Sequence, residues 1–356
     1  MAVTRVTYCA REDVKNALDI KLTARQDAIV DAAIEAATDT VEGELHRKFY
    51  PRVMTRYWDW PNFQYAYPWR IWFDEWEIAD ITVNVPVVTS GGVPIPASAC
   101  NFEPINDGPP YSYLELRRDL SYSFGNGPTP QRDVAIAATY GHWTKTTAAG
   151  QLAAAMTDTT GTTATVTNAA AVGVGNLITV DSERMLVADR AMVTTGQTQQ
   201  GSGVSTAHVN DVALQVPDGT QIHVGEVLQL DSERMLAVDV TGNVATVKRQ
   251  WDGTVLAAHT GATVFAARLL TVERAAYGTT AATHLNAAAV GVGLIPAGVR
   301  NWTTGLAVVD VVQKTGGYTT VQGSGPGSIV KVGAGLPALA DAAMAKYGRK
   351  SRQRAV

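Results

Sequence analysis

The sequence predicts an α+β protein: a helical bundle built from the N- and C-terminal helices, with a β-rich domain and a tandem-repeat β domain inserted between them. Three observations favour this fold class. Both ends of the 356-residue chain have helical periodicity, the middle alternates in the manner of strands, and part of that middle repeats itself. We expect divisions at residues 1–51, 52–145, 146–293 and 294–356.

Residues 1–51 are expected to supply the first helices of the bundle. A short helix is predicted over 11–19, and Thr23 and Gln26 form a Thr-x-x-Gln capping box before a second one. Pro51 prevents that helix from continuing. Its apolar residues recur three and four positions apart: Val30, Ala33, Ile34, Ala37, Val41 and Leu45.

Residues 52–145 are rich in β-forming residues, with strands expected over 52–60, 69–73, 78–85, 111–116 and 134–140. Ten of the chain's 26 aromatic residues lie between Tyr57 and Trp76. A stacking platform for sugar or single-stranded nucleic acid is one interpretation. Three arginines are opposed by four acids in and around this run, which weakens the case for nucleic-acid binding: Arg52, Arg56 and Arg70 against Asp59, Asp74, Glu75 and Glu77. We favour a mixture of β-domain core and subunit interface. The expected interface residues are Trp58, Trp60, Tyr65, Tyr67, Trp69 and Trp72.

Residues 146–293 contain internal repeats. The hexapeptide Asp-Ser-Glu-Arg-Met-Leu occurs at 181–186 and 231–236, and the octapeptide Asn-Ala-Ala-Ala-Val-Gly-Val-Gly at 168–175 and 286–293. At an offset of 25, Arg249 and His259 align with Arg274 and His284. These matches predict a tandem β module of about 50 residues with a partial third copy.

Residues 294–356 return to helical periodicity. Helices are predicted over 297–314 and from Pro337 to about Tyr347, separated by a segment rich in Gly and Ser. The chain then ends in a basic tail. Docking of this tail into a partner and fraying in solvent are equally weighted on the sequence alone.

The candidate chemical motifs all have a simpler structural interpretation. The pairs Glu183/Arg184 and Glu233/Arg234 are expected to be duplicated strand-end salt bridges. His208, His259 and His284 lack accompanying ligands at metal-binding spacing, so turn or strand-end histidines are favoured. The glycine-rich strings lack the remaining residues of a nucleotide-binding loop. We therefore expect no enzyme activity, no cofactor and no metal.

Composition limits the class of protein further. The net charge is −4 and only 17% of residues are charged, which argues against a protein that grips nucleic acid over most of its surface. Two cysteines exclude a disulfide scaffold. The N-terminus lacks the apolar stretch of a secretory signal, and no apolar stretch is long enough to span a membrane. We expect a soluble protein made in a reducing compartment.

A series of short motifs carries a family resemblance. It begins with Tyr-Cys-Ala-Arg-Glu-Asp-Val-Lys at residues 8–15 and Val-Glu-Gly-x-Leu-His-Arg-x-Phe-Tyr-Pro at 41–51. Asp-Trp-Pro at 59–61, Thr-Ser-Gly-Gly at 89–92 and Asn-x-Gly-Pro-Pro-Tyr at 106–111 follow. In their order and spacing, residues 8–145 resemble the head-to-tail connector (adaptor) proteins of tailed bacteriophages, in the long form found in phages of actinobacteria.

The resemblance implies an architectural function at the head–tail junction of a virion assembled in the host cytoplasm. Adaptors of this family form a ring, usually of twelve subunits, under the portal protein. They attach the next neck, stopper or tail protein and leave a channel for double-stranded DNA, without sequence-specific binding. The family's C-terminal segment docks against the portal, which by position implicates Tyr347, Arg349, Lys350, Arg352 and Arg354. We expect the β repeats on the outside of the ring.

A tail-fibre or adhesin-like protein that binds glycan is the alternative. The β modules and the aromatic cluster suit it, whereas the helical ends and the lack of a trimeric coiled-coil or collagen-like stretch do not. A portal complex would separate the two functions.

Overall fold

The computed structural model describes residues 3–18, 24–62, 67–142, 144–315, 321–322, 330–331 and 333–349. Contacts divide the chain into two units, and each is described by itself. The first unit comprises Met1–Val41, Thr146–Ala276 and Thr280–Ala343. The second comprises Glu42–Lys145, Tyr277–Thr279 and Met344–Val356. The expected cap residue Thr23 lies outside the described residues.

The second unit contains two antiparallel sheets. The larger has the order β1-β8-β4-β5, with β3 also paired to β8, and the smaller has the order β2-β7-β6. Alternate residues of both sheets face one shared core, which includes Ile71, Leu114, Ile136 and Tyr140. The strands are β1 (Arg52–Trp58), β2 (Arg70–Trp72), β3 (Ile78–Asp80), β4 (Val87–Ser90), β5 (Val93–Ile95), β6 (Cys100–Glu103), β7 (Tyr113–Leu116) and β8 (Val134–Tyr140).

The first unit is built on a ten-stranded antiparallel sheet. Its order is β13-β16-β15-β14-β17-β12-β11-β18-β9, with β10 also paired to β17. The strands are β9 (Thr146–Gln151), β10 (Thr163–Thr165), β11 (Leu177–Val180), β12 (Glu183–Thr198), β13 (Ala213–Gln215), β14 (Val227–Leu230), β15 (Glu233–Thr241), β16 (Val244–Trp251), β17 (Thr263–Glu273) and β18 (Ala289–Gly293).

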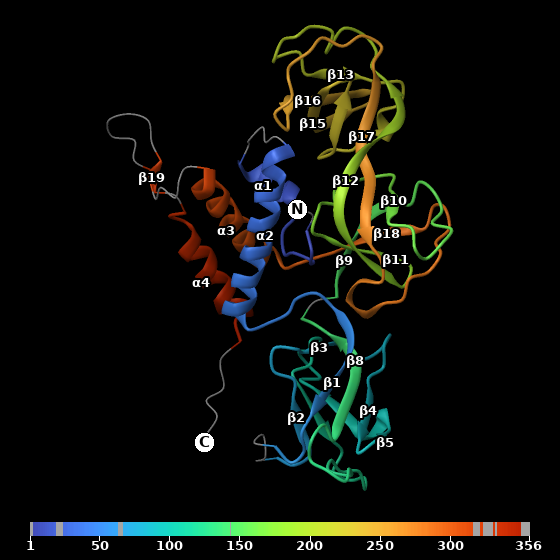
Figure 1. Ribbon diagram of the computed structural model, residues 1–356, viewed down its shortest axis with the longest axis vertical. Helices are drawn as coiled ribbons and strands as arrows, with labels where there is room; N and C mark the ends of the chain where they lie inside the picture. The colour runs from blue at the N-terminus through green and yellow to red at the C-terminus, as the bar shows by residue number, and fades with distance from the viewer. Residues whose placement is uncertain are drawn as a thin grey trace. The chain divides into compact units, whose positions relative to one another are not determined.

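The ten-stranded sheet closes on itself twice, forming two small barrels. An isolated bridge between Leu152 and Val166 joins the ends of β9 and β10, and closes the outer barrel. A bridge between Gln200 and Gln215 closes the inner barrel onto β13. The long strands β12 and β17 run side by side through both barrels (Figure 1). Each barrel therefore has its own apolar core.

The two barrels are copies of each other, and one is nested inside the other. β15 and β16 form a hairpin closed by Gly242 and Asn243, whereas the equivalent strands β12 and β17 are joined by the whole inner barrel. The same bulge occurs in both hairpins, because the pairs that flank it correspond one to one: Val187/Val272 and Asp189/Thr271 in the outer barrel, Ala237/Val247 and Asp239/Thr246 in the inner. The expected tandem order with a partial third copy is wrong, since the segment at offset 25 completes the first copy.

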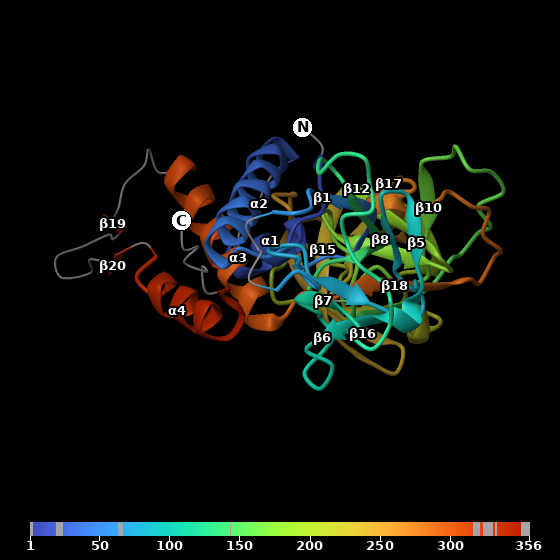
Figure 2. The same ribbon diagram turned by 90° about the horizontal axis from the view of Figure 1, so that it is seen from below.

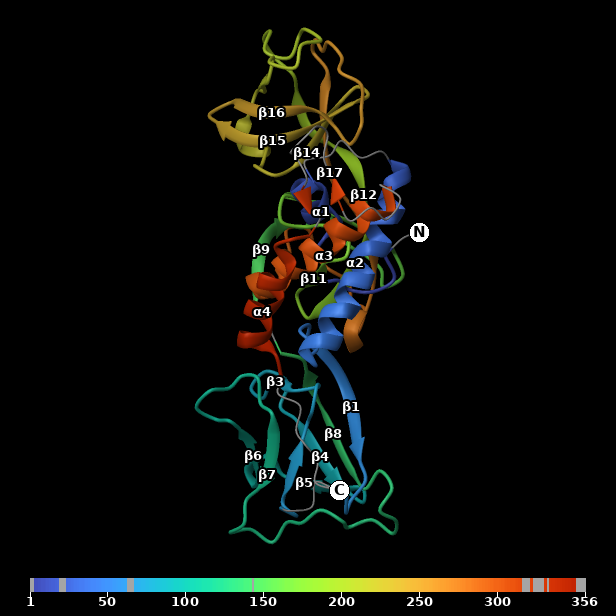
Figure 3. The same ribbon diagram turned by 90° about the vertical axis from the view of Figure 1, so that its left-hand side faces the viewer.

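Four helices accompany the strands: α1 (Arg11–Leu18), α2 (Ala24–Leu45), α3 (Ala297–Thr315) and α4 (Leu336–Tyr347). α3 lies between α2 and α4 in two views of the first unit (Figures 2 and 3). Three single-turn 3₁₀ segments and a two-stranded ladder complete the described elements: Ala97–Ala99, Gly219–Gln221, Ala276–Gly278, β19 (Val321–Gln322) and β20 (Val330–Lys331).

The predicted helical bundle is wrong: the described part of the chain is mostly antiparallel β-sheet, with four helices. The apolar stripe of α2 does not close a core with other helices alone. Its cluster also needs Val3 and Cys9 from the N-terminal segment and Val174 from the loop before β11. Backbone bonds from Thr7 to Gly175 (2.9 Å) and from Arg11 to Val174 (3.1 Å) fix that loop to the helices. The helices are therefore attached to the β structure, and the larger cores lie between strands.

Candidate functional site

The aromatic segment of the second unit divides between its core and its surface. Trp60 is 4% exposed and packs edge-on to Phe124, with ring centroids 5.1 Å apart. Trp58 and Trp69 are partly buried against the same core. Tyr67 is 46% exposed, and Trp72 is half-buried. Tyr65 lies outside the described residues. Of the expected interface residues, Trp60 is therefore a core residue, while Tyr67 and Trp72 lie at the surface.

An arginine stands among the surface aromatic rings. Cross-strand pairing places Arg70 opposite Glu115 and Trp72 opposite Tyr113, all on the face of the three-stranded sheet away from Ile71 and Leu114. The Arg70 guanidinium lies 4.6 Å from the Tyr67 ring centroid and 4.8 Å from that of Tyr113. Its Nε donates to a Glu115 carboxylate oxygen at 2.5 Å. We call Tyr67, Arg70, Trp72 and Tyr113 the aromatic face.

Exposed apolar side chains are frequent on the second unit. Among the described residues, nine of the large hydrophobic side chains that are exposed lie between Tyr57 and Tyr122. Tyr57 on strand β1 is 59% exposed and Val83 is 85% exposed. Contiguous exposed apolar patches are typical of sites where proteins associate, whereas single exposed apolar side chains are common on any protein surface. The others are Tyr67, Val85, Val87, Val93, Ile105, Leu120 and Tyr122.

The predicted docking residues Tyr347 and Arg349 contact the second unit of their own chain. The Tyr347 ring lies edge-on to Phe49 and to His142, with centroids 6.1 and 6.2 Å away. The Arg349 N–H donates to the Leu45 carbonyl at 3.1 Å, at the last residue of α2. We call Leu45, Phe49 and His142 the seat of the segment Tyr347–Arg349. Lys350, Arg352 and Arg354 lie outside the described residues.

A buried carboxylate, that of Glu77, binds the seat residue His142. The Glu77 side chain is buried and accepts a hydrogen bond from His142 Nδ1 at 2.9 Å. Burial alone would raise the pKa of Glu77, but the His142 hydrogen bond and the charges of Arg47, His142 and Arg349 outweigh it and lower that pKa. Arg349 therefore belongs to the electrostatic environment of Glu77.

The seat has favourable and unfavourable contacts of similar size. Edge-on aromatic pairs contribute about 0.5–1.5 kcal/mol each beyond the area they bury. Against this, Arg47 Nε and Arg349 Nη1 are buried and form no hydrogen bond with any described residue. Each buried unsatisfied donor costs about 1–3 kcal/mol. The segment is therefore held, but without a large surplus of stability.

The repeated hexapeptide builds a buried ion cluster in the outer barrel. Glu183 is fully buried and receives two hydrogen bonds from Arg274, at 2.7 and 2.8 Å. His284 bridges two carboxylates, with Nε2 2.9 Å from Glu183 and Nδ1 2.7 Å from Asp181. Both contacts are hydrogen bonds at once when both ring nitrogens carry protons.

The inner barrel repeats this cluster atom for atom. Glu233 is fully buried and is bound by Arg249 at 3.0 and 2.7 Å. His259 Nε2 lies 3.0 Å from Glu233, and Nδ1 lies 2.8 Å from Asp231. Burial alone would raise the pKa of each buried glutamate, but the arginine, two backbone N–H groups and the histidine lower it to about 2. The clusters are internally satisfied and structural.

Sequence reasoning found these glutamates and histidines but not their partners. It paired each glutamate with the arginine next to it, whereas Arg274 and Arg249 on the opposite strand bind Glu183 and Glu233. The signal was present, because Arg and His recur with the same ten-residue separation in both copies. The His208 side chain is exposed and contacts neither buried glutamate, although the His208 carbonyl accepts a hydrogen bond from Arg249 Nη1 at 3.4 Å.

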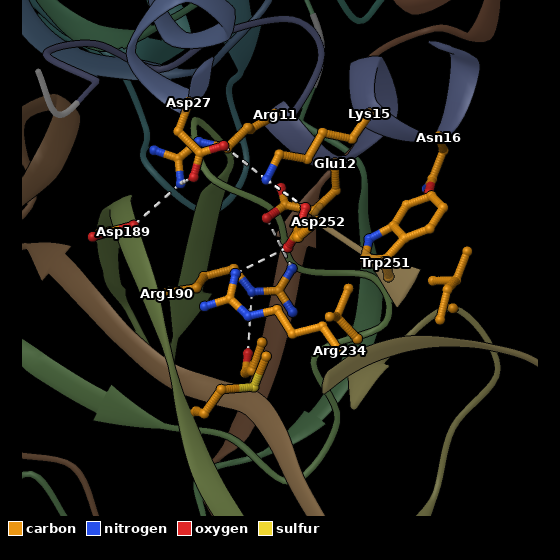
Figure 4. Close-up of a pocket in the computed structure, with 15 residues that line it drawn as sticks. Arg11, Glu12, Lys15, Asn16, Asp27, Asp189, Arg190, Arg234, Trp251 and Asp252 are labelled. Atoms are coloured by element: carbon orange, nitrogen blue, oxygen red, sulfur yellow. Dashed lines mark hydrogen bonds and ion pairs between the residues drawn. The ribbon is translucent and has the colours of Figure 1, made fainter. Parts of the chain in front are cut away.

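A charged pocket of about 230 Å³ lies in the first unit, beside α1 and both barrels (Figure 4). Arg11 binds Asp31 through two hydrogen bonds of 2.7 Å and approaches Asp189 at 3.2 Å. Lys15 Nζ lies 2.8 Å from Asp252, which also pairs with Arg234 at 3.1 Å. Figure 4 shows the pocket side chains with their ion pairs, including Arg11 with Asp189 and Lys15 and Arg234 with Asp252.

The charges of this pocket neutralise one another. Arg190 completes the set by pairing with Glu12 at 3.1 Å, so each of the four cations has a carboxylate partner. The buried indole of Trp251 lines the same pocket. Paired in this way, the residues attach α1 to the barrels and leave no cation of the set in excess.

The two cysteines are free and buried, Cys9 in the first unit and Cys100 in the second. Burial raises the pKa of the Cys9 thiol to about 12 and that of Cys100 to about 11. Neither is present as the thiolate at neutral pH, so neither is poised as a nucleophile.

A scan against protein-family models finds no match, and searches of curated proteins and of solved structures find no significant match. Within the described ranges, no group of three or more His, Cys, Asp or Glu side chains is arranged to hold a metal ion. No described helix is long and apolar enough to cross a membrane.

Proposed function

We propose that this chain is a structural head-to-tail adaptor of a tailed phage. It would form a ring under the portal protein, extend the DNA channel and attach the next neck or tail protein. The exposed apolar surface of the second unit, between Tyr57 and Tyr122, is the observation that carries the proposal. This stretch lies within the segment whose motifs resemble the adaptor family.

The charged clusters are consistent with an architectural function. Buried acids and bases that serve catalysis keep one group available to substrate. Here Glu183 and Glu233 are fully buried and each is bound by an arginine and a histidine. The four pocket cations are paired as well. These groups therefore stabilise the barrels and α1.

The aromatic face supplies a plausible centre for a subunit contact. Trp, Tyr and Arg are the residues that most often dominate interface energies. Tyr67, Arg70, Trp72 and Tyr113 bring these types together on one face of a sheet. We assign this face to the protomer interface, in place of the original set that included the buried Trp60.

The test is a complex with purified portal protein from the same phage. A stoichiometric complex on mixing, measured by analytical ultracentrifugation, is the expected result. Deletion of Tyr347–Val356 should remove the complex if that segment docks on the portal, and full binding by the deletion variant would contradict tail docking. No complex with the intact chain, together with binding to a glycan array, would instead support the glycan-binding alternative.

A further inference from the structure

We propose that the segment Tyr347–Arg349 is a self-docked latch. In the free chain this segment is bound to its own seat, and a partner that binds the same three residues would have to displace them from it. The proposal rests on the proposed function only for the identity of that partner. The docking of the segment on its seat is a property of this chain, and it is tested without any partner present.

The contacts involve each residue of the segment. Tyr347 completes a group of three mutually edge-on rings, since Phe49 and His142 are themselves 5.3 Å apart. Gly348 donates its N–H to the Met344 carbonyl at 2.9 Å, which ends α4. Arg349 then donates to Leu45. A side chain at Gly348 would meet the Met344 carbonyl oxygen at 2.4 Å, so only glycine permits this close turn.

The seat has contacts of its own besides those with the segment, because His142 is held by other groups of the second unit. Its Nδ1 faces Glu77 and Arg47, and its backbone N–H donates to the Lys48 carbonyl at 2.8 Å. Phe49 is fully buried. Release of the segment therefore does not require the second unit to unfold.

The interactions of the Arg349 guanidinium in the docked state are unfavourable and therefore favour release of the segment. Burial lowers the pKa of Arg47, the Glu77 charge opposes this, and the nearby Arg349 guanidinium lowers the pKa further by repulsion. One nitrogen of each guanidinium is buried without an acceptor among the described residues. A partner that offered a carboxylate to Arg349 would supply the acceptor that this guanidinium lacks, and withdrawal of Arg349 would relieve its repulsion with Arg47. Aromatic packing of Tyr347 therefore keeps the latch docked, and a partner carboxylate that competes for Arg349 would release it.

Limited trypsin digestion of the full chain tests the latch, since trypsin cleaves after Lys346 and Arg349. We expect Tyr347→Ala to increase the rate of cleavage there roughly tenfold, because it removes two edge-on ring contacts. Met344→Ala is the matched control: this side chain lies on the same helix, is exposed and leaves the rings intact, so its rate should equal that of the unmodified chain. Equal rates in Tyr347→Ala and Met344→Ala would overturn the proposal.

A second variant opens the latch and leaves the segment unchanged. His142→Ala should also accelerate cleavage, whereas the exposed His208→Ala should not. With portal present, His142→Ala should associate at least as fast as the unmodified chain. Accelerated cleavage without any portal complex would uphold the latch and contradict the adaptor function. Unaccelerated cleavage in a folded His142→Ala chain would contradict the latch, whatever the portal result.

Discussion

At the scale of the residue, identical side chains serve different purposes according to what surrounds them. Trp60 and Trp72 lie twelve positions apart in one aromatic run, yet one fills the core of the second unit and the other stands on its surface. Their composition alone favoured an interface for both. Burial separates them, because a core tryptophan is surrounded by its own chain and has no area left for a partner.

These two tryptophans should separate stability from assembly. Trp60→Ala leaves a cavity beside Phe124 and should lower the free energy of unfolding of the second unit by about 3–5 kcal/mol. Trp72→Ala should lower it by less than half as much and should weaken self-association. Urea unfolding followed by tryptophan fluorescence and sedimentation velocity give the two readouts. A Trp72→Ala chain that assembles normally would exclude the aromatic face from the interface.

Glu233 offers a residue-scale test of the duplicated clusters. Glu233→Gln removes the charge that compensates Arg249 in a fully buried site, and should destabilise the first unit by about 3 kcal/mol. Glu273→Gln, an exposed acid on β17, is the control and should change stability by less than about 0.5 kcal/mol. Chemical denaturation measures both. Equal denaturation midpoints for Glu233→Gln and Glu273→Gln would show that the cluster contributes no net stability.

At the scale of the element, repetition was visible before its arrangement was. Strands β11 and β14 each end directly before one copy of the hexapeptide. The predicted helices over 11–19, 297–314 and 337–347 correspond to α1, α3 and α4. What periodicity did not reveal is that β12 and β17 pair across a 64-residue interruption, because strand pairing is not encoded locally.

The nested arrangement predicts that the inner barrel can be excised. Residues 192–268 replaced by Gly-Asn would join Ala191 to Leu269 as Gly242 and Asn243 join Thr241 to Val244. We expect the shortened chain to retain a β-rich circular dichroism spectrum and a cooperative unfolding transition. Deletion of the same length starting at Ala169 cuts through the outer barrel and should abolish the transition. Similar behaviour of both deletions would contradict the nesting.

At the scale of the whole molecule, the buried ion clusters and most of the exposed apolar side chains lie in different parts of the chain. The buried ion clusters lie in the first unit, and most of the exposed apolar side chains among the described residues lie in the second. Glu226 is a further fully buried carboxylate of the first unit, bound by Arg268 at 2.7 and 2.8 Å. Among the described residues, the first unit thus holds three buried glutamates with lowered pKa values and the second holds Glu77, so conditions that neutralise such acids should affect the first unit more than the second.

Acid should destabilise the first unit more strongly than the second. The pKa values of Glu183, Glu226 and Glu233 are about 2 in the folded state against 4.5 for the free side chain, so the folded state binds fewer protons. Their stabilisation, about 3 kcal/mol each, is complete above pH 4.5 and is lost as pH falls toward 2. Thermal melts between pH 7 and 2 should show this loss, with a smaller slope in Glu233→Gln. A melting temperature constant from pH 5 to 2.5 would contradict it.

The sequence by itself determined the local features of this protein: where helices and strands form, that a β module is duplicated, and which charged residues recur. Only the tertiary structure decided how they combine. The octapeptide at 168–175 forms a loop whose Val174 completes the helical cluster, whereas the same eight residues at 286–293 contribute strand β18. Local propensity is identical in the two copies, so the difference comes from what each one packs against. For the same reason the terminal helices were predicted, but not their attachment to the β structure.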